Sequence, residues 1–227
     1  MTEKEQKHTS WLIRNIPLPP GVSTGEEIAN SITHGIGALL SLAGLVLLVL
    51  RAALRGDAWA VVGFSVFAFA AMNLYTASTL YHALTGPRVK RVFRILDHTS
   101  IYILIAGTYT PVTLAAMRGP WGWTVFGVVW GIAISGILFE IFLMGKFKKL
   151  SLVLYILLGW IIVLAWKPMT RMVSPAFIRW LIAGGGAYTA GTVFYAWKRL
   201  PYGHAIWHLF VLGGTVLHFF GMYLNLT

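Results

Sequence analysis

Two histidines, His204 and His208, stand four residues apart at the end of the segment Pro201–His208. In a helix, residues at this spacing lie one turn apart on the same face, which is how a helix offers two imidazole groups to one metal ion. The stretch from Leu209 to Leu226 contains no Lys, Arg, Asp or Glu. A metal-ligand pattern therefore stands at the start of a helix apolar enough to enter a membrane, where unpaired polar groups are costly.

Two other apolar segments carry polar residues where they end or begin. Ser78 and His82 lie near the end of one segment, and Asp97 opens the next. If these helix ends reach the same membrane face, His82, His204 and His208 supply three imidazoles, enough for a catalytic zinc ion with a fourth position left for water. Zinc lowers the pKa of such a water towards 7. Asp97 could then hold or deprotonate the water, and Ser78 could hydrogen-bond a substrate oxygen.

Each of these residues also has a simpler interpretation. Asp97 precedes Thr99 and could cap a helix. Ser78 could serve as a small residue that lets helices pack closely. Histidine and aspartate are also common at the depth of the lipid headgroups. The expected coincidence in depth of three helix ends favours the joint metal site over these separate roles.

The composition indicates an all-α integral membrane protein with one helical domain. Hydrophobic residues make up 57% of the 227 residues and charged residues 11%, against roughly 25% charged in an ordinary soluble domain. The net charge is +11, but the basic residues fall in short loops between apolar segments. This distribution predicts control of membrane topology and no nucleic-acid partner. The absence of cysteine excludes disulfides and thiolate ligands.

Seven apolar segments approach the ~20 residues that span a bilayer. They lie at about 32–50, 58–82, 98–117, 121–142, 150–166, 178–197 and 204–226. Residues 1–29 are predicted to form a cytoplasmic tail, and 30–227 a seven-helix transmembrane domain. The tail and alternate loops carry twelve Lys and Arg residues, against six on the other side. The positive-inside rule therefore places the N-terminus in the cytoplasm and the C-terminus outside a multi-pass plasma-membrane protein.

Four further polar residues lie in or beside the apolar segments. His34 is expected either to support the metal ligands or to pack among small residues, and His98 to point away from the site of Asp97. His218 lies about 21 Å along its helix from His204, so an interhelical hydrogen bond is expected there. Glu140 is expected to extend to the interface or to pair with a basic loop residue.

Several of these segments resemble one known family. They are Glu26-Glu27-x-Ala-Asn-Ser-x-x-His34-Gly, Ser78-x-x-x-His82, Leu96-Asp97-His98 followed by Ile-Ala-Gly-Thr-Tyr-Thr-Pro, and His204-x-x-x-His208. Together they look like the bacterial haemolysin III proteins, the prokaryotic branch of the progestin and adipoQ receptor family, which is related to the alkaline ceramidases. The resemblance implies a seven-helix bundle with a cytoplasmic N-terminus. It also implies zinc held by His82, His204 and His208, Asp97 acting through a water, and a structural or donor role for Ser78.

Two classes of function fit the sequence. The first is a zinc-dependent hydrolase that cleaves a membrane-lipid amide or ester and contributes to membrane homeostasis. The second is a non-enzymatic sensor, receptor-like or haemolysin-type membrane protein in which zinc is structural. A pore should show polar residues along several helix faces, and these spans show few. The state of the metal's fourth position separates the two classes, because an open position beside Asp97 favours hydrolysis. The sequence specifies neither the lipid nor the oligomeric state.

Overall fold

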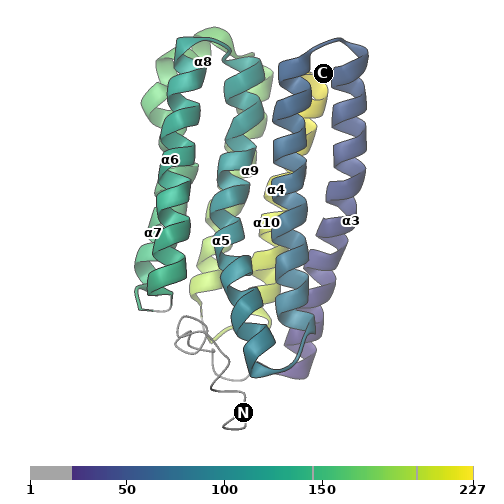
Figure 1. The fold of residues 1–227 in the computed structure, drawn as a ribbon, viewed down its shortest axis with the longest axis vertical. Helices are drawn as coiled ribbons and strands as arrows, with labels where there is room; N and C mark the ends of the chain where they lie inside the picture. Colours follow the sequence, from purple (N-terminus) through teal and green to yellow (C-terminus); the bar gives the residue numbers. More distant parts are fainter. Residues whose placement is uncertain (1–21, 145, 198, 227) are drawn as a thin grey trace.

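The computed structural model describes residues 22–144, 146–197 and 199–226, which form one bundle of roughly antiparallel helices (Figure 1). No strand occurs in these ranges. In chain order the elements are α3 (Thr24–Leu54), α4 (Ala58–Ala83), α5 (Pro87–Pro111), the π-helix η1 (Val112–Ala116), α6 (Pro120–Leu143), α7 (Lys148–Gly159), the 3₁₀ helix η2 (Ile161–Ala165), α8 (Trp166–Met172), α9 (Pro175–Ala196) and α10 (Gly203–Asn225). Most of the predicted tail, residues 1–29, lies outside the described residues.

Helix starts are set by local capping chemistry. Ser23 and Glu26 form a capping box that begins α3 at Thr24, eight residues before the apolar run itself. Asp57 caps α4 by accepting hydrogen bonds from the backbone N–H groups of Trp59 and Ala60. The capping box matters for the site, because the first turns of α3 extend the helix past the end of α4 that carries His82.

The helix type changes at Pro111. Pro111 lacks a backbone N–H, and after it the chain continues as the π-helix η1. One turn earlier, Gly107 allows α5 to approach α4 closely, because a Cβ at this position would lie 2.5 Å from the Cβ of Ala70. The close contact brings the start of α5, with Asp97, next to the end of α4, with His82.

Neighbouring helices pack in the order α3 on α4 and α4 on α5, and α10 closes the bundle by packing on both α9 and α3. Three apolar clusters fill the interior. The first is centred on Phe64, Phe177 and Met222, the second on Tyr102 and Val129, and the third on Tyr75. α4 and α10, which carry the three histidines, both contribute to the first and third clusters, so the same two helices hold the core and the candidate site.

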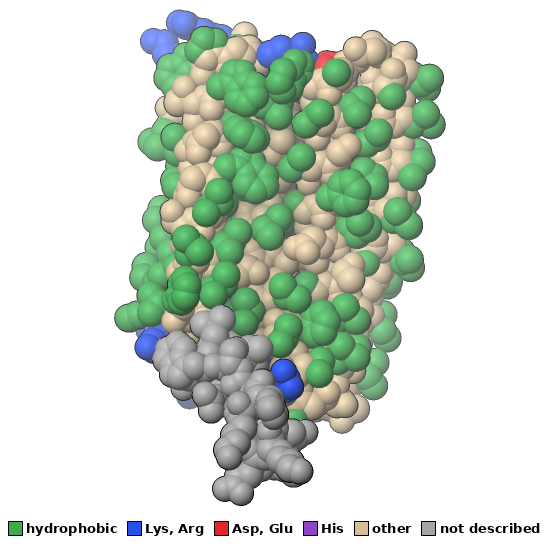
Figure 2. All heavy atoms as spheres, in the orientation of Figure 1, with side chains coloured by type: hydrophobic (Ala, Val, Ile, Leu, Met, Phe, Trp, Pro, Cys, Tyr) green, Lys and Arg blue, Asp and Glu red, His purple; other side chains and the backbone are tan. Residues whose placement is uncertain are grey.

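The outer surface of the bundle is apolar. Leucine side chains such as Leu39 and Leu164 are 72% and 84% exposed, and hydrophobic side chains cover the flank while most Lys and Arg lie at its two ends (Figure 2). Among the described residues, six helical stretches are long and apolar enough to cross a membrane. α9, which covers most of the expected span 178–197, is a helix of the bundle but is not among those six. The fold is therefore that of an all-α membrane protein.

Candidate metal centre

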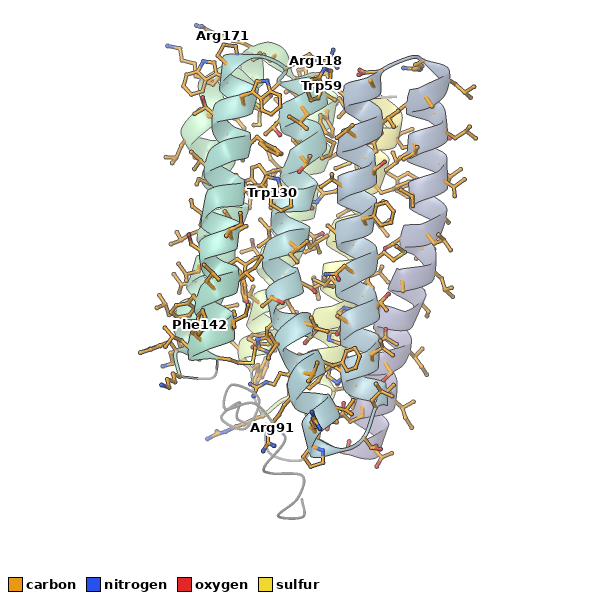
Figure 3. The ribbon with its side chains drawn as sticks, in the orientation of Figure 1. Trp59, Arg91, Arg118, Trp130, Phe142 and Arg171 are labelled. Carbon is orange, nitrogen blue, oxygen red and sulfur yellow. The ribbon has the colours of Figure 1, made fainter. Side chains whose placement is uncertain are left out.

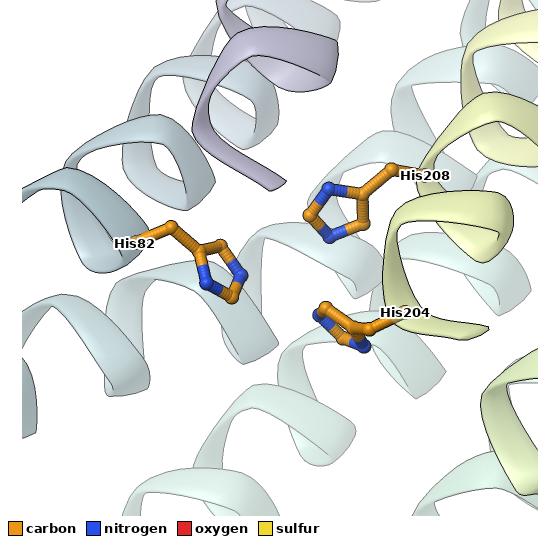
Figure 4. A group of neighbouring side chains, drawn as sticks. All are labelled: His82, His204 and His208. Atoms are coloured by element: carbon orange, nitrogen blue, oxygen red, sulfur yellow. The ribbon is translucent and has the colours of Figure 1, made fainter. Parts of the chain in front are cut away.

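Three histidines from two helices meet at one end of the bundle. His82 lies in the last turn of α4, and His204 and His208 lie in the first turns of α10 (Figure 4). One ring nitrogen from each lies within 4.8 Å of the other two. The structure thus brings together the three histidines that the sequence pattern grouped, in an arrangement that could hold a metal ion.

Hydrogen bonds from α3 fix the orientation of two of these rings. Nδ1 of His82 lies 2.5 Å from Oε2 of Glu27. Nδ1 of His208 lies 3.2 Å from the backbone carbonyl of Asn30 and 3.2 Å from the hydroxyl of Thr33. A carbonyl only accepts, so Nδ1 of His208 donates, and its Nε2 is left with a lone pair. Metal-binding histidines are typically held in this way by a carboxylate or a carbonyl on the other nitrogen.

The residues therefore fit a metal ion. Nε2 of His82 is buried and has no hydrogen-bond partner among the described residues. Glu27 is itself held by Lys90, whose ammonium group lies 2.5 Å from Oε1. Glu27, Asn30 and Thr33 were not assigned a role from the sequence, although Glu27 and Asn30 belong to the segment that ends at His34. The signal lay in that motif, but the contact with His82 depends on how α3 packs against α4.

His34 packs on the ligand cluster rather than hydrogen-bonding within it. Its ring stacks on that of His208, with centroids 3.5 Å apart and planes 10° from parallel. The side chain is buried, and neither ring nitrogen has a partner among the described residues. Of the two roles expected for His34, packing among small residues is not what the contacts show: its ring lies against the rings of His208 and Tyr75, so it supports a candidate ligand.

Ser78 and Asp97 lie beside the histidines from two sides. Ser78 is fully buried one turn before His82, and its hydroxyl completes no hydrogen bond with a described group. The carboxyl group of Asp97, on α5, interacts with Ser78 and with the ring of His82. Asp97 also lines the interior cavity. The two residues expected to support catalysis are therefore placed next to a candidate metal ligand.

Two of the other polar residues differ from expectation, and one agrees. Glu140 does not extend to the interface: it is buried, accepts a hydrogen bond from the hydroxyl of Tyr155 at 3.2 Å, and lies 3.9 Å from Nδ1 of His98. His98 faces Glu140, yet it also lines the same cavity as Asp97. His218 forms the expected interhelical hydrogen bond, with Nε2 donating to the carbonyl of Leu181 at 3.3 Å. The carboxylate of Glu140 is kept inside because α5 and α7 supply its partners.

A cavity of about 170 Å³ runs through the interior of the bundle. Asp97, His204 and His208 line one end, and Met169 on α8 lies at the other. Most side chains between these ends are apolar. Two of the three histidines, His204 and His208, therefore lie where a mostly apolar interior space meets the polar end of the bundle.

Fold and site together define an all-α membrane protein with a histidine cluster that could bind a metal. Residues 22–219 match the sequence profile described as "Haemolysin-III related". The chain is 49% identical over 195 residues to Hemolysin-3 of Bacillus cereus, covering 86% of this chain and 89% of that protein. It is 47% identical to the Hemolysin-3 homolog of Bacillus subtilis, covering 86% and 92%. The chain belongs to the haemolysin-III-related family, as its motifs predicted.

A more distant relative places the family in a wider group. Identity to the human monocyte to macrophage differentiation factor is 26% over 204 residues, which covers 87% of this chain and 83% of that protein. The match extends over nearly all of the helical region, so the relationship concerns the whole bundle and not the histidine motif alone.

Proposed function

We propose that this protein is a metal-dependent hydrolase that cleaves an amide or ester bond in a membrane lipid. The single observation that carries the proposal is that Asp97, His204 and His208 line the same mostly apolar cavity. An acyl chain lying in that cavity would place its carbonyl group at the histidine cluster, while the headgroup stays at the polar end of the bundle. Binding of the chain would hold the carbonyl next to the catalytic groups.

Zinc is the metal that the donors favour. His82, His204 and His208 offer three nitrogen ligands, the protein share of an open catalytic zinc site, and the chain has no cysteine to close the shell. When bound there, zinc would polarise the substrate carbonyl and make a water molecule acidic enough to attack at neutral pH. Glu27 and the carbonyl of Asn30 would keep the Nδ1 atoms of His82 and His208 occupied, so that both rings offer Nε2.

The chain's own groups divide the remaining work. The carboxylate of Asp97 takes a proton from the attacking water, and later returns it to the leaving amine or alcohol. The hydroxyl of Ser78, buried beside the carboxyl group of Asp97, donates to the carbonyl oxygen as negative charge develops on it. The apolar walls of the cavity exclude bulk water and so strengthen both interactions.

The proposal includes seven membrane crossings in the plasma membrane, with the N-terminus in the cytoplasm. α3 starts at one end of the bundle and α10 finishes at the other (Figure 1), as an odd number of crossings requires. The excess of Lys and Arg on the N-terminal side supports the orientation. A reporter fused to the C-terminus should be active outside the cytoplasm; activity only in the cytoplasm would contradict seven crossings in this orientation.

The decisive test is an Asp97→Asn variant compared with His204→Ala. Asp97→Asn should keep the metal and lose roughly 10²–10⁴-fold in the rate of fatty-acid release from lipid amides and esters in liposomes. His204→Ala should lose metal and rate together. If Asp97→Asn lost the metal as completely as His204→Ala, Asp97 would be a ligand and the proposed division of roles would fail. If the wild type bound metal but hydrolysed none of the lipid amides and esters tested, a non-enzymatic sensor with a structural metal would be the better function.

A further inference from the structure

Arg94, on α5, is a buried cation that makes no close ion pair with a described residue, although the Asp97 carboxyl lies near enough to interact with it electrostatically. The side chain is only 4% exposed, and its Nη1 atom is buried without a hydrogen-bond partner. No ion pair or hydrogen bond to Arg94 occurs in the described part of the chain. Arginine is almost never fully buried unless it is paired, because taking its charge out of water costs several kcal/mol.

Other cations of this chain show what pairing looks like here. Lys90, one turn before Arg94, binds Glu27 at 2.5 Å, and Arg118 binds Asp57 at 2.7 Å although the side chains of Arg118 and Asp57 are 51% and 40% exposed. The chain has 18 Lys and Arg but only 7 Asp and Glu. Exposed Arg118 has a directly paired carboxylate, whereas no carboxylate of the described residues pairs directly with the buried Arg94, so the unpartnered Nη1 atom could bind an anion from another molecule.

The surroundings of Arg94 indicate what kind of anion this is. Arg94 is three residues before Asp97, about 4.5 Å along the helix on the same side, and it interacts electrostatically with Tyr81, Asp97 and Tyr195. Asp97 and Tyr195 both line the apolar cavity, whereas Arg94 does not. Arg94 therefore interacts with two residues that line the mostly apolar cavity without lining it itself.

We propose that Arg94 binds the phosphate group of a lipid whose acyl chain occupies the cavity. A ligand that satisfies both features needs an oxyanion joined to a long apolar chain. Arginine donates to phosphate through two parallel N–H groups. Phosphate is favoured over a carboxylate because Arg88, Lys90 and Arg91 precede Arg94 within two turns, and clustered cations at a membrane surface attract anionic headgroups. This binding would persist in a protein that hydrolysed nothing, so it stands apart from the proposed activity.

The test measures the affinity of dodecyl phosphate for purified protein in a non-ionic detergent, against dodecanol as the uncharged analogue. Arg94→Gln should weaken the binding of dodecyl phosphate by about tenfold to a hundredfold, the usual loss when a hydrogen bond to a charged group is removed. The affinity for dodecanol should stay unchanged. Arg88→Gln is the matched control, because Arg88 is on the same helix and is exposed. An equal loss in both variants would mean diffuse attraction and would overturn the site.

Three further readouts separate the remaining outcomes. Inorganic phosphate should compete for the Arg94 site far more weakly than dodecyl phosphate does. Equal competition by the two would reject a lipid ligand. Dodecanoate should also bind more weakly than dodecyl phosphate, and equal affinities would reject phosphate as the preferred headgroup. The melting temperature of lipid-free Arg94→Gln should equal or exceed that of wild type, since an unpaired buried charge is removed; a sharp fall would show that Arg94 is structural. Arg94→Lys, which keeps the charge, should retain part of the preference for phosphate.

Discussion

The two ends of the helix bundle differ in what they bury: unpartnered polar atoms at one end and packed apolar side chains at the other. At one end, the buried side chains of Asn30, Ser78, His82 and Arg94 each carry a polar atom without a hydrogen-bond partner among the described residues. At the other end, Phe64, Met117, Met169, Phe177 and Met222 form a closely packed apolar cluster with exposures of 1% or less. Several buried polar atoms at the polar end therefore lack partners, whereas the residues of the apolar cluster carry no such atom.

The same helices make both ends. α4 contributes Phe64 to the apolar cluster and His82 to the histidines, and α10 contributes Met222 and His208. The apolar end can therefore fix the positions of helices whose other ends carry the candidate metal site. We expect substitutions at the two ends to separate: those at the polar end change what the protein binds, and those at the apolar end change how stably it folds.

The largest expected effect is loss of the metal at the polar end. His208→Ala should reduce bound zinc from about one ion per chain to a small fraction, because an open site keeps only three protein ligands and cannot lose one. Elemental analysis of purified protein checks this. His218→Ala is the control, a buried histidine on the same helix that binds Leu181 instead. Equal zinc in His208→Ala and wild type would remove His208 from the site.

At the apolar end, Phe64→Ala should lower the free energy of unfolding by about 3–5 kcal/mol, because it leaves a cavity among fully buried side chains. Zinc content at saturating metal should stay near that of the wild type. Phe69→Ala, on the same helix with a side chain that is 54% exposed, should change stability much less. If Phe64→Ala emptied the metal site while the protein stayed folded, the two ends would not be independent. Denaturant titration in detergent and elemental analysis provide both readouts.

A smaller effect is expected from the carboxylate that orients His82. Glu27→Gln keeps the shape of the side chain but loses its charge, and should weaken zinc binding by about 10–100-fold. The neighbouring Glu26 accepts hydrogen bonds from the backbone N–H groups of Ser23 and Tyr202 and not from a histidine, so Glu26→Gln should leave zinc affinity nearly unchanged. Competition with a metal chelator measures both constants, and similar losses in the two variants would contradict the role of Glu27.

The smallest expected effect lies at the surface of the apolar end, where Asp57 caps α4 and pairs with Arg118. Asp57→Ala should cost about 0.5–2 kcal/mol through the lost cap. Asp57→Asn keeps a capping side chain and loses only a partly exposed ion pair, so its cost should stay below about 1 kcal/mol. Melting temperatures distinguish the two variants, and equal losses would assign the effect to the charge rather than to the cap.

The same ion pair has a defined dependence on pH. Partial burial raises the pKa of Asp57, but hydrogen bonds from Ala60 and Arg118 outweigh this and hold that pKa below its usual 3.8. The stabilisation is therefore complete above the ordinary aspartate value and is lost as the pH falls through the lower pKa of the folded state. The difference in stability between wild type and Asp57→Asn should shrink over that acidic range and stay constant near neutrality.

Composition and spacing were sufficient for much of this protein. Apolar runs near the length of a membrane span predict the helices, and the lack of charge after His208 places His204 and His208 at the start of one of them. The motifs around Ser78, His82 and Asp97 identified the family. These features are local, because helix periodicity and span length depend on neighbouring residues and not on the fold.

Only the tertiary structure decided which buried polar groups have partners. Glu140 reads from the sequence as a residue that reaches the interface, but Tyr155 and His98 hold it inside. Glu27 reads as part of a polar tail, but the capping box extends α3 far enough to place it on His82. Arg94 reads as one more basic residue of a loop, and only the packed bundle shows it buried and unpaired. The reason is physical: the partner of a polar side chain depends on how helices that are distant in sequence pack together, and no local sequence pattern specifies that packing.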